Sequence, residues 1–239
     1  MARRGLQGTP ADRRSRIRGV RLKRSTGIDL MEIVFLLEQV VNGLVLGGYY
    51  LLLALGLSLI FSVGGVVNLA HGAFYALGAY VSLEASKHLG FAGGVIVSPL
   101  VVGLLGIAFE RFLLRRFYTA DPILSLLVTF GLAMVAEQFL RMVWGAAPLA
   151  SSMPPGMKGQ VLVGEMMFSR YRLFLLAVVV AVLIGIWLLL HKTAFGRVVR
   201  AGVQRPDMVA VLGIRLQPYM TAIVVLGVGM AALGGALFG

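Results

Sequence analysis

The chain of 239 residues contains no cysteine, and this absence removes several kinds of site at once. Without cysteine there is no disulfide bridge, no thiolate nucleophile, and no zinc or iron–sulfur centre held by cysteine. Charged residues are also scarce, at 13% of the chain, against about 25% in a soluble domain. Together with 59% hydrophobic residues and a mean hydropathy of +0.90, this shortage excludes a soluble globular enzyme and a disordered chain. The class that is left is a polytopic helical membrane protein.

Sequence motifs of the common hydrolases and nucleotide-binding enzymes are missing as well. The chain has no Gly-Lys dipeptide, hence no phosphate-binding loop, and it has neither a His-Glu-x-x-His motif nor a Gly-x-Ser-x-Gly elbow. We therefore expect no enzymatic activity, no cofactor and no metal site. If ATP energises transport through this protein, another chain must hydrolyse it.

Positive charge is concentrated at the N-terminus, where residues 1–30 carry nine Lys and Arg against two Asp. This segment shows almost no apolar periodicity, so we expect a disordered extension. A basic tail can bind anionic lipid headgroups or nucleic acid, or stay solvated without a specific partner; we expect membrane lipid and no nucleic acid. Because Met31 directly precedes the first apolar run, a second hypothesis is that the natural chain begins there. The expected division is an extension, 1–30, and a transmembrane domain, 31–239.

Apolar runs long enough to cross a bilayer, which takes about 20 residues, predict an all-α bundle of transmembrane helices. We place the runs at 33–62, 66–86, 92–114, 122–144, 172–191 and 217–239. The last run reaches the final residue without a polar flank, so we expect the bundle to be incomplete at its C-terminus.

Lys and Arg in the loops predict the orientation, since they are in excess on the cytoplasmic side. They cluster in 111–121 and in 192–216, which two spans separate, so both segments should be cytoplasmic and 145–171 should lie outside. Three crossings before residue 111 would place the basic extension outside, against the rule. Either the region 62–72 is broken or re-entrant, or the extension is not native.

The stretch Asn68-Leu69-Ala70-His71-Gly72 is the most informative part of the spans. An unsatisfied polar group in hydrocarbon costs several kcal/mol, so intramembrane Asn and His side chains face a bundle interior or a water-filled path. The flanking glycines are typical of a broken helix that lines a site. The alternative is that Asn68 and His71 only tie helices together. Upstream, Gly43-x-x-x-Gly47 and Gly48, with Gly56 one to two turns further on, predict a close approach of helices. Among the few acids that could relay protons, Glu137 is the best candidate.

Segment 194–215, between the last two spans, predicts a short helix at the membrane surface. Pro206 suits its first turn, Asp207 complements the helix dipole, and Gly213 suits the position that ends it. Met208, Val211 and Leu212 give this helix an apolar face. It can dock into a groove on a partner protein or lie on the membrane.

Several motifs occur in one order along the chain. They are Asn42-Gly43-Leu44 with Gly47, Tyr50, Leu52 and Ala54-Leu55-Gly56-Leu57; Gly65, Asn68 and Ala70-His71-Gly72; Gly78-Ala79-Tyr80; Glu110-Arg111 with Arg115-Arg116; Thr129-Phe130-Gly131-Leu132; Trp144-Gly145; and Phe195-Gly196-Arg197 with Arg200-Ala201, Pro206 and Leu212-Gly213-Ile214. Over about residues 36–239 this pattern resembles the branched-chain amino acid ABC transporter permeases, and the LivH-like half more than the LivM-like half.

The resemblance implies a multi-pass subunit in a bacterial inner membrane. Its partners would be a second, LivM-like permease, two cytosolic ATPase subunits and a periplasmic amino-acid-binding protein. The expected residues of the translocation path are Asn42, Asn68, His71, Gly72 and Thr129. The expected residues of ATPase coupling are Arg197, Arg200, Pro206, Asp207, Ala210, Leu212, Gly213 and Ile214. Alternatives that stay open are an ABC permease for urea or short-chain amides, a secondary transporter without an ATPase, and a membrane scaffold that transports nothing.

Overall fold

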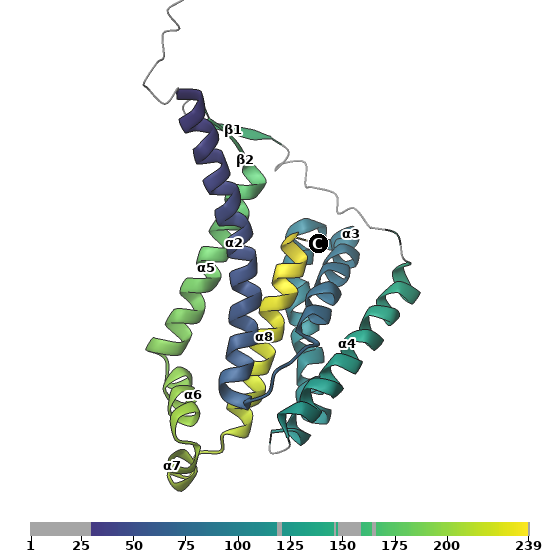
Figure 1. Ribbon diagram of the computed structural model, residues 1–239, viewed down its shortest axis with the longest axis vertical. Helices are drawn as coiled ribbons and strands as arrows, with labels where there is room; N and C mark the ends of the chain where they lie inside the picture. The colour runs from purple at the N-terminus through teal and green to yellow at the C-terminus, as the bar shows by residue number, and fades with distance from the viewer. Residues whose placement is uncertain (1–29, 119–120, 146, 148–158, 164–165, 239) are drawn as a thin grey trace, which may run out of the picture.

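The computed structural model describes residues 30–118, 121–145, 147, 159–163 and 166–238, so the expected extension lies outside the described residues except for Leu30. The described part is almost entirely helical, in agreement with the predicted fold class, and Figure 1 labels its elements. In chain order they are α2 (Leu30–Gly64), α3 (His71–Phe112), the 3-10 turn η1 (Leu114–Arg116), α4 (Pro122–Trp144), β1 (Gln160–Val163), β2 (Met166–Ser169), α5 (Arg170–Lys192), α6 (Ala194–Gln204), α7 (Pro206–Val211) and α8 (Gln217–Phe238).

α3 is a hairpin of two antiparallel arms rather than one straight helix. Gly90 interrupts it with φ 71° and ψ 174°, a conformation that suits glycine alone. The hydroxyl of Ser98 donates to the carbonyl of Gly78 at 2.7 Å, although a straight helix would separate the two residues by about 30 Å. The rings of Phe74 and Phe109 also meet, with centroids 5.0 Å apart. The two arms are therefore paired along their length.

The chain thus passes between the two ends of the bundle as often as the apolar runs predict. Five helices, α2, α3, α4, α5 and α8, are long and apolar enough to cross a membrane, and α3 crosses twice because it folds back at Gly90. Its arms, 71–89 and 91–112, correspond to the expected spans 66–86 and 92–114. The first arm begins later than predicted because residues 65–70 are not helical.

The two basic segments lie at the same end of the bundle, which we call the basic end. Arg115 in η1 donates to the hydroxyl of Thr221 near the start of α8 at 3.3 Å, and α6 and α7 project from this end in Figure 1. The ring of Tyr118 lies against Gly64, so α2 also ends here and begins at the opposite end. The predicted break between α2 and α3 is present, but it leaves three passes before residue 111, so it does not bring Leu30 to the basic end.

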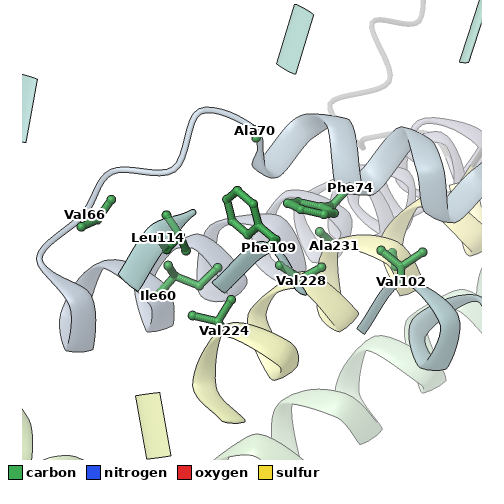
Figure 2. Packing of buried hydrophobic residues seen from close by; sticks show 11 residues of the cluster. Ile60, Val66, Ala70, Phe74, Val102, Phe109, Leu114, Val224, Val228 and Ala231 are labelled. Atoms are coloured by element: carbon green, nitrogen blue, oxygen red, sulfur yellow. The ribbon is translucent and has the colours of Figure 1, made fainter. Parts of the chain in front are cut away.

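α8 is the central helix of the bundle and lies between α2 and α3 (Figure 1). The backbones of α8 and α2 are in direct contact where they cross, because a Cβ at Gly227 would lie 2.6 Å from the carbonyl oxygen of Gly56. Figure 2 shows the apolar cluster beside this crossing, where Val228 of α8 packs among buried side chains of α2 and of both arms of α3. α5 packs on the outer side of α2, and α4 flanks α3.

Two details differ from the sequence prediction. β1 and β2 form a small antiparallel hairpin, with Val161 paired to Phe168, inside segment 145–171, where an all-α fold has no strand. Of the four α2 glycines expected at a close helix approach, Gly43 and Gly47 do not take part, since a Cβ at either would meet no atom of the described chain within 4 Å. The approach is made at the other two expected positions, Gly48 and Gly56.

Candidate functional site

Residues 65–70 form the break between α2 and α3, and two polar side chains hold its backbone. Asn68, which is 1% exposed, accepts a hydrogen bond through Oδ1 from the backbone N–H of Ala70 at 3.0 Å. Thr129 on α4 accepts from the backbone N–H of Leu69 at 3.2 Å and donates to the carbonyl of Ser125 at 2.8 Å. Since a hydroxyl can accept and donate at once, Thr129 links α4 to the backbone of the break by a hydrogen bond.

His71 is the first residue of α3, and its imidazole lies against the backbone of Gly56 on α2. A Cβ at Gly56 would lie 3.1 Å from both Cε1 and Nε2 of the ring, so only glycine leaves the ring its space. His71 is 5% exposed. Among the described residues, Nδ2 of Asn68 has no hydrogen-bond partner, and the His71 ring nitrogens make no hydrogen bond of good geometry, although the backbone of Leu53 lies near the ring. An unpaired buried polar group costs about 1–3 kcal/mol, and such atoms are suited to bind a polar group that enters from outside the chain.

Three of the five predicted path residues, Asn68, His71 and Thr129, therefore meet at the break. Gly72 follows His71 in the chain but is exposed, and no atom lies within 4 Å of the position that a Cβ would take. The break thus has a buried polar side and an open side. The sequence motif predicted the buried polar side. The open side depends on how α3 is rotated relative to α2 and α4.

Asn42 lies elsewhere. It is separated from Gly64, the last residue of α2, by about 33 Å along the helix axis. There it accepts a hydrogen bond from the guanidinium of Arg172 on α5. The structure therefore does not bring Asn42 together with the other predicted path residues.

The elbow between α5 and α6 is built from close backbone contacts. Thr193 accepts a hydrogen bond from the N–H of Gly196 at 3.2 Å and so caps α6. Arg200 donates from Nη1 to the carbonyl oxygen of Leu190 at 2.6 Å, which satisfies a free carbonyl in the last turn of α5. A Cβ at Gly196 would lie 2.0 Å from that same oxygen. Arg200, predicted as a coupling residue, is half-buried in this elbow, while Arg197 is exposed.

α7 is the short helix that the sequence predicts in segment 194–215. Pro206 is its first residue and Asp207 lies in its first turn. Gly213 follows the helix with φ 76°, and its N–H bonds to the carbonyl of Ala210 at 2.9 Å. Ile214 is half-buried, and its N–H bonds to the carbonyl of Val209 at 3.3 Å. The stop that glycine predicts is therefore confirmed.

The apolar face of this segment points away from the bundle. Met208 is 57% exposed, Val211 84% and Leu212 76%, whereas Val209 on the other side of α7 is buried. Large apolar side chains in a patch of this kind indicate an interaction site. We call these three residues the α7 face.

A buried carboxylate that the sequence interpretation missed lies at the basic end. Glu110, which is 1% exposed, accepts from Nε and Nη2 of Arg115 at 3.3 and 3.2 Å and from the hydroxyl of Thr221 at 2.9 Å. Tyr118 adds a longer hydrogen bond of 3.4 Å. Burial and the neighbouring Glu110 carboxylate raise the pKa of Tyr118, which keeps its hydroxyl protonated as a donor. One carboxylate thus joins α3, η1 and α8.

Glu137, the acid that the sequence favoured as a proton relay, is not buried. Its side chain is 65% exposed and forms an ion pair with Arg141 one helical turn away, at 2.6 Å. A signal for Glu110 does exist, because it is an acid inside the apolar run 92–114 and an arginine follows five residues later. Its partner Thr221, 111 residues away, gives no such signal. Within the residues that the structure describes, no three His, Asp or Glu side chains form a group able to hold a metal ion.

These features define a multi-pass membrane protein with polar residues buried between its helices, as in membrane transport subunits. Residues 39–239 match the family model described as the permease component of the branched-chain amino acid transport system, and the chain belongs to this family.

Curated relatives agree with this assignment. The high-affinity branched-chain amino acid transport system permease protein LivH of Salmonella typhimurium is 26% identical over 223 residues, which cover 87% of this chain and 72% of the relative. BraD of Pseudomonas aeruginosa, a permease protein of the same description, is 25% identical over the same shares. The nucleoside ABC transporter permease protein NupC of Lactococcus lactis is 31% identical over 160 residues, 66% of this chain and 44% of the relative. No solved structure matches the chain significantly.

Proposed function

We propose that the chain is the membrane-spanning permease subunit of an ATP-binding-cassette importer for branched-chain amino acids. The family match over residues 39–239 carries this proposal, and the descriptions of LivH and BraD support it. The subunit provides the membrane path, and partner subunits hydrolyse ATP. It acts in a bacterial inner membrane with the basic end in the cytoplasm, because Lys and Arg accumulate on that side.

The translocation path passes the break at 65–70. Among the described residues, Nδ2 of Asn68 has no partner and the ring nitrogens of His71 make no hydrogen bond of good geometry, so they can bind the polar groups of a passing amino acid. The surrounding apolar side chains suit a leucine-like side chain. Gly72 forms the open side of the break, Thr129 holds its backbone, and Asn42 belongs to the far end of the path.

The α7 face is the contact for an ATPase subunit. An exposed apolar helix face fits a groove on a partner protein, and the exposed Arg197, Arg205 and Arg215 surround it with positive charge. In this proposal Pro206, Asp207, Ala210, Gly213 and Ile214 shape α7, and Arg200 holds the elbow behind it. The complete importer contains two ATPases, a LivM-like permease and a periplasmic amino-acid-binding protein, surrounded by membrane lipid.

Uptake of radiolabelled leucine tests this proposal. The chain and candidate partner subunits would be produced together in cells that lack their own branched-chain uptake systems. We expect ATP-dependent leucine uptake that excess isoleucine abolishes, and no uptake when the ATPase carries a substitution in its phosphate-binding loop. Uptake that persists with this inactive ATPase would instead support a secondary transporter.

A nucleoside is the second candidate substrate, because NupC has the higher identity over its shorter match. Competition in the same assay separates the two candidates. Uridine should leave leucine uptake unchanged if the branched-chain assignment is correct. Uptake of uridine but not of leucine would move the chain to the nucleoside branch, and uptake of urea alone would support the short-amide alternative.

A further inference from the structure

The first turn of α8, residues 217–221, is held to the rest of the bundle by the Glu110 carboxylate. We call this turn the foot of α8. Thr221 lies one turn after Gln217, the first residue of α8. Its single hydroxyl proton has two acceptors in reach, a Glu110 carboxylate oxygen at 2.9 Å and the Gln217 carbonyl at 3.1 Å, and the nearer, charged oxygen is the stronger acceptor. The hydroxyl oxygen accepts from Nη2 of Arg115 at 3.3 Å. Glu110, Arg115 and Thr221 therefore form a closed triangle of charge-assisted hydrogen bonds, which are stronger than those between neutral groups.

The same carboxylate also reaches the end of α2. The hydroxyl of Tyr118 bonds to Glu110 at 3.4 Å, and the Tyr118 ring lies against Gly64, just before the break. The ends of α2 and α3 and the start of α8 thus converge on one charged group. All three ends belong to helices that pack around the candidate path.

On the assumption that the proposed function is correct, we propose that Glu110 is a positioning residue that latches the foot of α8 to α3 and transmits movement of α7 into the bundle. Only residues 212–216 separate α7 from α8, so a displacement of α7 pulls directly on Gln217. Release of the Thr221 hydroxyl from Glu110 frees the foot of α8.

Because α8 stays in contact with α2 at one point along its length, release of its foot lets the helix rotate about that point. Further along the helix, Gly227 is fixed against Gly56 by backbone contact, and this crossing acts as a pivot. An apolar groove of about 530 Å³ borders Thr221 between α3, α5, α6 and α8, so the foot has space to move. The His71 ring lies against the same Gly56, which places the pivot beside the break.

Distance measurements between spin labels test the latch. Because the native chain has no cysteine, cysteines introduced at two chosen positions are the only ones that carry labels. Labels at Phe112, which is 70% exposed, and at exposed Gln217 report the separation of α3 and α8 at the basic end. The full chain would be measured in lipid nanodiscs by double electron–electron resonance. We expect one narrow distribution for the native chain.

Thr221→Val and Glu110→Gln should each add a second, longer distance. Loss of a hydrogen bond to a charged group should raise the released population about tenfold. Thr221→Ser keeps the hydroxyl and should restore the single distance. Ser62→Ala is the matched control, because the Ser62 hydroxyl bonds only to the Ser58 carbonyl of its own helix. If Thr221→Val fails to insert, Tyr118→Phe removes another donor from Glu110 and should give a smaller effect of the same kind.

A single unchanged distance in every variant that inserts would overturn the latch. Leucine uptake separates this failure from failure of the proposed function. If Thr221→Val releases α8 while the native complex takes up no leucine, the latch stands and the substrate assignment fails. If Thr221→Val lowers uptake without any change in distance, the latch is wrong and the importer assignment stands.

Discussion

Gly56 of α2 and Gly227 of α8 face each other so closely that a Cβ on either would lie 2.6 Å from the carbonyl oxygen of the other. The contact is mutual and involves backbone on both sides. A neighbouring side chain can change its rotamer to accept a new methyl group, but a backbone carbonyl inside a helix cannot. The crossing therefore has little tolerance for substitution.

Gly227→Ala should lower the free energy of unfolding by about 1–3 kcal/mol, the usual range for an overpacked site. Thermal unfolding of the purified chain in detergent measures this loss. The matched control is Gly43→Ala, because no atom of the described chain lies within 4 Å of a Cβ at Gly43. In the helix interior, alanine is favoured over glycine by about 1 kcal/mol, so Gly43→Ala should not lower the free energy of unfolding. Equal destabilisation by both variants would contradict the proposed pivot.

Thr129→Val should destabilise the break by less than the cost of a fully buried unpaired donor, which is about 1–3 kcal/mol, because Leu69 is 47% exposed. The variant keeps the shape of the side chain but leaves the N–H of Leu69 without its acceptor at 3.2 Å. Thr129→Ser keeps this acceptor and should stay close to the native protein. Hydrogen exchange at the Leu69 amide gives a local measurement, and unaltered protection in Thr129→Val would show that the bond does not hold the break.

Arg200→Glu should uncouple ATP hydrolysis from uptake while the chain remains inserted in the membrane. The new carboxylate would face the carbonyl of Leu190, which Arg200 now contacts at 2.6 Å, and repulsion would open the elbow behind α7. The ratio of ATP hydrolysed to leucine transported in proteoliposomes measures this uncoupling. Arg200→Lys retains a donor and should recover part of the coupling. A native ratio in Arg200→Glu would remove the elbow from the coupling route.

Gly213→Pro should uncouple transport for a different reason. Gly213 has φ 76°, whereas proline fixes φ near −65°, so the chain cannot leave α7 in its present direction. The N–H that bonds to Ala210 at 2.9 Å is lost as well. The α7 face would then point elsewhere, and co-purification with the ATPase should decrease. Retention of both ATPase binding and leucine uptake would rule out a role for this turn.

The sequence predicted most of the fold because the membrane imposes strong patterns on it. Runs of apolar residues identify the passes, and Gly90, between two such runs, marks the turn of the α3 hairpin. Local chemistry likewise predicted α7 from Pro206, Asp207 and Gly213. In each of these cases the signal lies within a few neighbouring residues.

Long-range pairing could not be read in the same way. Of the four glycines expected to pack closely, Gly56 makes the contact with α8, whereas Gly43 and Gly47 meet no neighbour within the described chain, because the rotation of each helix decides which face meets a neighbour. For the same reason the sequence indicated Glu137 as the best candidate for a proton relay and did not single out Glu110 as a buried acid. The burial of Glu110 depends on Thr221 and on the fold-back of α3, and neither is visible in one local stretch of sequence.

The central position of α8 has a consequence for how the protein is made. α2 and both arms of α3 leave the ribosome before α8, yet α8 is the helix that lies between them and fills the space along both. Until α8 enters the bilayer, the surfaces of α2 and α3 that α8 covers have no α8 to contact, and the Glu110 carboxylate lacks the Thr221 hydroxyl. The α3 hairpin can therefore pair before α8 is made, whereas the contacts at Gly56 and Glu110 form only when α8 arrives.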